Sequence, residues 1–317
     1  MKAPDDALIL GWDVGGTKSA AIVASRAGEV LSREQWPSRA ERGWQAMLGD
    51  FINHAGRLRQ QFAAIAGVGV SIGGPLNPLT GVILSPPHLP HWDRVPLVAE
   101  LQRRLALPVV AEHDAAACLL AEWLWGGARG TTHAVYVTCG TGCGAGILVG
   151  GRILRGPDGQ TPEVGHIRLA PDGPLMFGKA GCTESFCSGE GIARLAAWMF
   201  PERFDAPVPT RRLAELAAGG DADARAVLVE SARRTGQLIA LLADTFSPQV
   251  VLLGSLARYF GPWWVEEVAS AFVAEALPAN SAQTRIAPAE LGEDLQDLSA
   301  IAAWIGRQPN PADVKTE

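Results

Sequence analysis

Short apolar runs separated by glycine turns open this chain. An apolar run at 7–12 leads into Asp13 and a glycine turn at 15–17, and a second apolar run follows at 19–24. This order predicts a strand, a tight turn and a returning strand. Between 43 and 64 the apolar residues recur every three or four positions, as on one face of a helix.

The remaining pattern alternates between strand and helix periods. Strands are expected at 67–72, 109–112, 134–138, 147–149 and 250–253. One helix is expected to begin near 95–96, and others are expected at 115–125, 186–199, 211–218, 222–246, 262–275 and 295–305. A glycine turn at 140–146 joins two of these strands, so the second half repeats the opening strand, turn and strand. Such alternation predicts an α/β fold.

Length and composition narrow the class of protein. With 317 residues the chain is long enough for two domains. A formal net charge of −6 argues against binding to nucleic acid, which requires concentrated positive charge. The chain contains no uncharged apolar run of about 18 residues and carries Asp5 and Asp6 where a signal peptide needs basic residues, so we expect neither a membrane span nor a signal peptide. Five unevenly spaced cysteines predict reduced thiols and a cytoplasmic protein.

The two glycine turns do not fit the common nucleotide motifs. Residues 140–145 satisfy a degenerate dinucleotide fingerprint, but a strand pattern follows where the fingerprint needs a helix. Residues 15–18 lack the earlier glycine of a P-loop. Glycine turns can nevertheless direct backbone N–H groups at a phosphate, and a strand-end carboxylate such as Asp13 could hold Mg²⁺ beside it. The alternative is that both are ordinary hairpins.

Several polar residues are candidates for chemistry. Asp114 follows an apolar strand and precedes a helix, where it could act in a site or simply accept an N–H at the helix start. Glu163, His166 and Glu184 lie in glycine-rich loops, as ligands or as solvated side chains. His88 and His91 could form a metal pair, but the sequence around them does not supply a complete ligand set, and we expect no zinc there. Cys139 and Cys143 are interpreted as small core residues.

These motifs together resemble the ROK (repressor, open reading frame, kinase) sugar kinases over nearly the whole chain. The resemblance rests on Asp13-Val14-Gly15-Gly16-Thr17-Lys18, Gly73-Gly74-Pro75, Glu112-His113-Asp114-Ala115, Gly140-Thr141-Gly142, Glu163-Val164-Gly165-His166, Gly181-Cys182-Thr183-Glu184 and 248–254. It implies a two-lobed actin-like ATPase (ribonuclease H-like) fold with an interdomain cleft. We expect a small lobe at 1–115 plus 298–317 and a large lobe at 116–297.

The resemblance also implies a function and a set of roles. It implies phosphorylation of a hexose hydroxyl by ATP, usually at O6, with Asp114 as the catalytic base and a homodimer as the assembly. Phosphates and Mg²⁺ would be bound by Asp13, Gly15, Gly16, Thr17, Lys18, Gly140, Thr141 and Gly142, adenosine would lie near Gly254, and the sugar would be held by Gly74, His88, His113, Glu163, His166 and Glu184. Glucose comes first, with other hexoses and N-acetylhexosamines as alternatives.

The chain departs from the family pattern in ways that affect these expectations. His113 and His88 stand where the family usually has asparagine, so the sugar stays open. Leu175 and Phe177 stand where the family's zinc site has its first two cysteines, leaving His166 and Cys182. Because tetrahedral zinc needs four ligands, we predict no structural zinc and apolar packing of Leu175 and Phe177 instead. A catalytically silent sugar sensor and an ATPase that acts on protein partners remain alternative functions.

Overall fold

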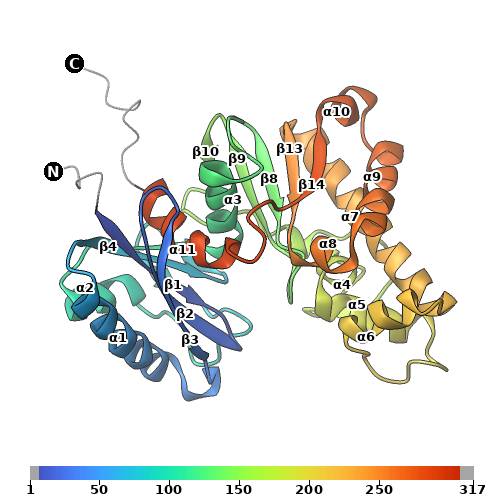
Figure 1. Ribbon diagram of the computed structural model, residues 1–317. Coiled ribbons are helices and arrows are strands. Elements are labelled where there is room, and N and C mark those ends of the chain that lie inside the picture. Colours follow the sequence, from blue (N-terminus) through green and yellow to red (C-terminus); the bar gives the residue numbers. More distant parts are fainter. Residues whose placement is uncertain (1–6, 308–317) are drawn as a thin grey trace. The chain divides into compact units, whose positions relative to one another are not determined.

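The computed structural model describes residues 7–307 and divides into two compact units (Figure 1). Unit 1 contains 1–129, 155–161 and 293–317, and unit 2 contains 130–154 and 162–292. The lobes expected from the sequence differ from these units at 116–129, 155–161 and 293–297, and their outermost residues lie outside the described range. The expected lobe division therefore stays a proposal. None of the helices within 7–307 combines the length and apolarity needed to cross a membrane.

Unit 1 is built on a five-stranded sheet in the order β3-β2-β1-β4-β7. The expected hairpin is confirmed, because β1 (Leu8–Val14) pairs antiparallel with β2 (Lys18–Ala24). On its other edge β1 pairs parallel with β4 (Ile65–Ile72), and β4 pairs parallel with β7 (Val109–His113). The edge strand β3 (Val30–Pro37) was not predicted, since its alternating exposed positions lack an apolar run. Two short strands, β5 (Leu76–Asn77) and β6 (Val82–Ile83), form a separate hairpin.

Helices cover both faces of this sheet. Trp12 of β1 stacks on Phe51 of α1 (Trp44–Gln61), and α2 (Leu97–Leu105) joins the same core. On the opposite face, α11 (Leu295–Gly306) packs closely on β1 and β4, and α3 (Asp114–Trp125) packs against α11. Glycine is needed under α11, because a Cβ at Gly69 would lie 1.9 Å from the Ala300 carbonyl oxygen. The helix η1 (Ala40–Arg42) precedes α1.

Unit 2 has a second five-stranded sheet, in the order β10-β9-β8-β13-β14. The predicted repeat of the opening plan is confirmed: β8 (Ala134–Val137) and β9 (Ala145–Val149) are antiparallel neighbours, and β10 (Arg152–Ile153) extends the hairpin. β13 (Val250–Leu253) runs parallel to β8 and to β14 (Arg285–Pro288). The long helix α7 (Ala222–Phe246) packs against α9 (Pro262–Glu275).

The other elements of unit 2 are short. They are η2 (Val164–His166), β11 (Leu175–Met176), β12 (Lys179–Ala180), α4 (Thr183–Cys187), α5 (Gly189–Met199), α6 (Thr210–Ala218), α8 (Ser255–Phe260) and α10 (Pro278–Gln283). The single helix expected at 186–199 is wrong, because the chain is extended at Ser188, whose hydroxyl accepts the Gly191 N–H and begins α5. The sequence did not predict α10 or β14, both too short for a clear period.

Candidate functional site

The glycine turn after β1 is a compact backbone structure. The Gly15 N–H donates to the Lys18 carbonyl oxygen at 3.2 Å, and the Ser38 hydroxyl donates to the Gly15 carbonyl oxygen at 2.6 Å. A Cβ at Gly16 would lie 2.7 Å from the His88 carbonyl oxygen, so only glycine fits there. The structure thus brings His88 against the predicted phosphate turn, while the Lys18 side chain at its far end is exposed.

Asp13 has an unusual electrostatic environment at the end of β1. Burial raises the pKa of its carboxyl to about 7, with Asp297 and Asp114 adding to the rise and Lys18 and Arg33 opposing it. At neutral pH this carboxyl is therefore poised between its two protonation states. A cation beside it would favour the ionised form, because an opposite charge lowers a carboxyl pKa.

Two further oxygens near Asp13 lack partners. Strand register pairs Asp13 with Ser71, and both lie two residues beyond glycines that face α11, so their side chains point to α11 as well. The Ser71 hydroxyl and Asp297 Oδ1 are buried without a hydrogen bond, although Arg33 donates to Asp297 Oδ2 at 2.5 Å. Sequence reasoning missed both residues.

This oxygen-rich set fits the Mg²⁺ that the resemblance implies. Mg²⁺ is usually bound by one or two carboxylates together with substrate phosphates and water, so Asp13 would hold it with Asp297 close by. Over 7–307 no cluster of three or more His, Cys, Asp or Glu side chains could hold a metal ion by itself.

Asp114 is the first residue of α3, directly after β7. Its Oδ1 accepts the Ala115 N–H at 2.7 Å, while a Cβ built at Gly73 would lie 3.9 Å from Oδ2. The side chain is 43% exposed, so one carboxylate oxygen remains available to a ligand. The alternative expectation for Asp114 is that it accepts an N–H at the start of the helix. It does accept the Ala115 N–H, but the N-cap residue of α3 is His113.

His113 has a defined tautomer in this arrangement. Its Nδ1 accepts the Ala115 N–H at 3.2 Å, so the proton of the neutral imidazole is on Nε2. The residue is 8% exposed. It can therefore offer one directed N–H donor, where an asparagine amide would offer both a donor and an acceptor. Gly74 lies in the turn between β4 and β5.

In unit 2 the turn between β8 and β9 is fastened to two helix starts. The Gly140 N–H donates to the Gly142 carbonyl oxygen at 3.0 Å, and the Gly189 N–H of α5 donates back to the Gly140 carbonyl oxygen at 2.7 Å. The Ser255 hydroxyl of α8 donates to the Cys139 carbonyl oxygen at 3.2 Å. The structure therefore brings Gly254, which precedes Ser255, together with the second predicted phosphate turn.

Glu184 connects this turn to the other predicted sugar residues. Its Oε2 accepts the Cys143 N–H at 3.1 Å. A Cβ at Gly142 would lie 3.4 Å from Oε2 and one at Gly165 would lie 3.2 Å from it, so the carboxylate sits between the two turns. Glu184 is buried, whereas Glu163 and His166, on either side of Gly165, are exposed. These residues share one region of unit 2.

The expected apolar packing of Leu175 and Phe177 needs correction. Leu175 is 60% exposed and Phe177 is 47% exposed, because in the small β11–β12 hairpin the side chain turned inward is that of Met176, which lies between them. Phe177 does contact the His166 ring, with centroids 4.6 Å apart. One imidazole and one aromatic ring thus meet where the family resemblance places zinc ligands.

All five cysteines lie within the described residues, are buried and form no disulfide bond. Cys139 and Cys143 belong to the unit 2 core, as expected. Hydrogen bonding with Cys139 and Cys187, together with burial, raises the pKa of the Cys143 thiol well above its ordinary value. A thiol held in its protonated form is a poor nucleophile, so these residues are packing groups.

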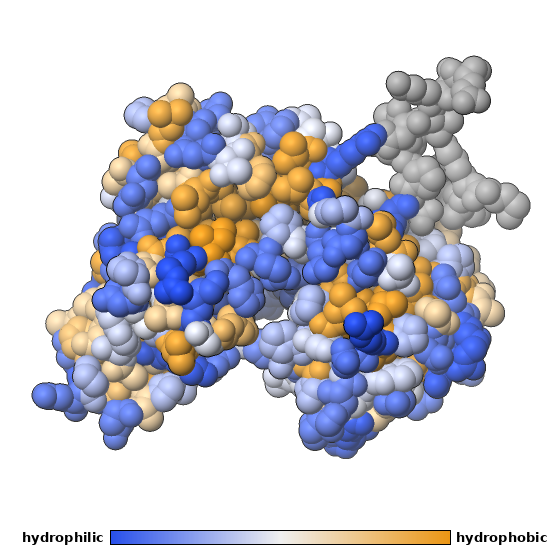
Figure 2. All heavy atoms as spheres, turned by 180° about the vertical axis from the view of Figure 1, so that it is seen from behind, coloured by the Kyte–Doolittle hydropathy of each residue, from blue (hydrophilic) through white to orange (hydrophobic). Residues whose placement is uncertain are grey.

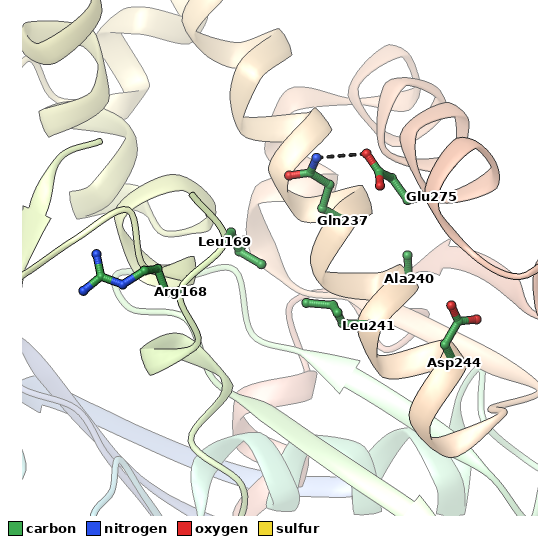
Figure 3. Close-up of a pocket in the computed structure, with 7 residues that line it drawn as sticks. All are labelled: Arg168, Leu169, Gln237, Ala240, Leu241, Asp244 and Glu275. Carbon is green, nitrogen blue, oxygen red and sulfur yellow. Dashed lines mark hydrogen bonds between the residues drawn. The ribbon is translucent and has the colours of Figure 1, made fainter. Parts of the chain in front are cut away.

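A separate pocket of about 320 Å³ lies on unit 2 (Figure 3). Its lining comes from α7, α9 and the loop between η2 and β11, and consists of Arg168, Leu169, Gln237, Ala240, Leu241, Asp244 and Glu275. None of these residues is a candidate from the sequence. Gln237 donates to Glu275 across it at 3.0 Å. Leu241, which lines the pocket, is 48% exposed. Figure 2 shows one face of the molecule, on which hydrophobic areas lie among hydrophilic ones.

Comparison with known proteins identifies the family. The model of the ROK family matches residues 9–305. The chain belongs to the ROK family. Its fold is accordingly the actin-like ATPase fold of the ROK kinases.

Individual relatives agree with this assignment. The chain is 32% identical over 261 residues to a glucokinase of Streptomyces coelicolor, covering 78% of this chain and 81% of that protein. It is 33% identical over 256 residues to an N-acetylmannosamine kinase of Shigella flexneri, covering 78% and 82%. A ROK glucokinase of Streptomyces griseus, solved with glucose and AMPPNP, superposes with a TM-score of 0.80 at 29% identity, covering 96% of this chain and all of that one.

Proposed function

We propose that this ROK family protein transfers the terminal phosphoryl group of ATP to a hexose hydroxyl, with O6 of glucose as the first candidate and Asp114 as the general base. The assignment to the sugar kinases follows from the family and from relatives named glucokinase. The observation that carries the specific role of Asp114 is its place directly after β7, where its side chain is 43% exposed and only Oδ1 accepts the Ala115 N–H.

The residues of unit 1 divide the chemistry among them. Asp114 would accept the proton of the attacking sugar hydroxyl, and the Nε2–H of His113 would donate to a neighbouring sugar oxygen. The turn at Gly15, Gly16, Thr17 and Lys18 would offer N–H groups and a positive charge to phosphates. Mg²⁺, bound at Asp13, would neutralise the phosphate charge that develops during transfer.

The residues of unit 2 would bind both substrates. The turn at Gly140, Thr141 and Gly142 would hold phosphates. Gly254 would lie near adenosine, because the neighbouring Ser255 hydroxyl ties this part of the chain to the phosphate turn. Glu184, with Glu163 and His166 beside it, would accept hydrogen bonds from sugar hydroxyls. Support for ATP as donor comes from the related glucokinase solved with AMPPNP.

Glucose is the first candidate and an N-acetylhexosamine is an alternative, because relatives are named for two different sugars. His113 and His88 stand where the family usually has asparagine, so imidazoles in place of amides change the hydrogen-bond donors and acceptors offered to a sugar hydroxyl. A homodimer, which the resemblance implies, and a cytoplasmic location, which the cysteine pattern predicts, are part of the proposal.

The experiment is a substrate panel. ADP release is measured with glucose, mannose, fructose, allose, N-acetylglucosamine and N-acetylmannosamine, for the wild type and for Asp114→Asn. We expect one preferred sugar and a loss of roughly 10²- to 10⁴-fold in kcat for the variant, since general base catalysis contributes about that much. Asp205→Asn, at an exposed aspartate, is the matched control.

Three results would contradict the proposal. Full activity in a folded Asp114→Asn protein would remove the base. Sugar binding without ADP release would indicate a silent sensor, and ATP hydrolysis that ignores every sugar would indicate an ATPase with another partner.

A further inference from the structure

A buried ion pair lies immediately before the proposed base. Glu112, the residue before His113 in β7, is fully buried. Arg155 donates from Nη1 to Glu112 Oε1 at 2.9 Å and from Nη2 to Oε2, which makes the contact bidentate. Oε1 also accepts the backbone N–H of His113 at 2.9 Å. A continuous set of hydrogen bonds therefore leads from Arg155 to the backbone next to Asp114.

Arg155 reaches this position from a distant part of the sequence. It begins the segment 155–161, which belongs to unit 1 although the residues before and after it belong to unit 2. The segment is held by a turn in which the Gly156 N–H donates to the Gln160 carbonyl oxygen at 2.8 Å. A Cβ at Gly159 would lie 2.9 Å from Leu79, so this turn packs tightly on unit 1.

A buried pair of this kind adds little net stability. The desolvation of both groups offsets their attraction, so a well-packed pair of apolar side chains often gives the same stability. Removing one partner, in contrast, leaves a costly unpaired charge. What the pair adds is direction, because two parallel hydrogen bonds fix the carboxylate plane. Here the fixed carboxylate holds the backbone N–H of His113 through its Oε1. The backbone of His113 in turn sets the directions of its own imidazole and of the Asp114 carboxylate.

We propose that Glu112 and Arg155 are positioning residues that orient His113 and Asp114 for catalysis. The inference rests on the proposed function, since it presumes that Asp114 is the base. It gives Glu112 a role in the Glu112-His113-Asp114 motif that involves no contact with substrate. It also makes the segment 155–161 part of the support of the active site.

The test separates orientation from stability with three variants of the full chain: Arg155→Met, Glu112→Leu, and the two combined. Each single change should lower both the denaturation midpoint and kcat, because it leaves one buried group unpaired. The combined variant should regain most of the midpoint, but its kcat should remain at least about tenfold below the wild type. Misplacing a reacting group by about 1 Å can cost around 100-fold. Arg103→Met, in the exposed pair with Glu100, is the control.

A second readout does not depend on turnover. Long-range ¹H–¹⁵N spectra report the tautomer of each histidine, and His113 should show an unprotonated Nδ1 in the wild type and in Arg103→Met. In the combined variant that signature should shift toward a mixture, since His113 is no longer fixed.

The proposal is overturned if the combined variant recovers wild-type kcat along with its midpoint, or if its His113 signature is unchanged. A purely structural pair would give those results. If the wild type phosphorylates no sugar, the proposed function fails by itself, and the histidine spectra still decide whether the pair orients His113.

Discussion

Asp13 should make the cation-free protein less stable as the pH rises. Its pKa is raised from 3.8 to about 7, mainly by burial. Between these values the unfolded chain has lost a proton that the folded chain keeps, so folding becomes less favourable with increasing pH, and the loss is complete above about pH 7. A shift of roughly three units corresponds to about 4 kcal/mol. Because the side chain is partly accessible, we expect about 2 kcal/mol or more.

The perturbation that isolates this effect is Asp13→Asn. Urea denaturation, followed by circular dichroism in the presence of a chelator from pH 4 to 8, should show the variant about 2 kcal/mol more stable than the wild type at pH 8 and equal to it near pH 4. Carboxyl groups far from Asp13 titrate alike in both proteins and cancel, whereas Asp297 and Asp114 interact with Asp13 and contribute to the difference. A variant that is less stable at pH 8, or whose difference from the wild type does not change with pH, would refute the reasoning.

Two further predictions follow from individual contacts. Gly254→Ala should destabilise unit 2 by roughly 3 kcal/mol or more, because the added Cβ would lie 1.8 Å from the Thr138 carbonyl oxygen. Gly56→Ala, in α1 with open space around it, should instead stabilise the protein by about 0.5–1 kcal/mol. Urea denaturation measures both changes, and equal effects would contradict the packing argument. Elemental analysis of the purified protein should find zinc far below one atom per chain, since Leu175 and Phe177 supply no ligand, and a stoichiometric signal would refute this.

The two hairpins and most helices could be predicted because their signals are local. Glycine clusters mark where each strand turns back, and apolar periods mark the helices. The grouping of Asp13 with the turn at 15–18 follows from chain adjacency alone. The prediction failed where the local sequence carries little signal. The edge strand β3 has no apolar run, and the break between α4 and α5 at Ser188 depends on one hydroxyl that caps a helix.

The missed residues of the candidate site share a different cause. Ser71 and Asp297 meet Asp13 only through strand pairing and the packing of α11, and Arg155 meets Glu112 across 43 residues. No spacing in the sequence marks such partners. Asp297 did carry one signal, as a charged residue at a buried position of an apolar helix.

The late position of α11 in the chain has a consequence for biosynthesis. One side of the first sheet is lined by glycines that receive this helix, and its residues, Leu295–Gly306, leave the ribosome after nearly all of unit 2. Throughout most of translation that side of β1 and β4 has no cover. The nascent protein must therefore keep this open face of the sheet from associating with other chains until α11 has been made.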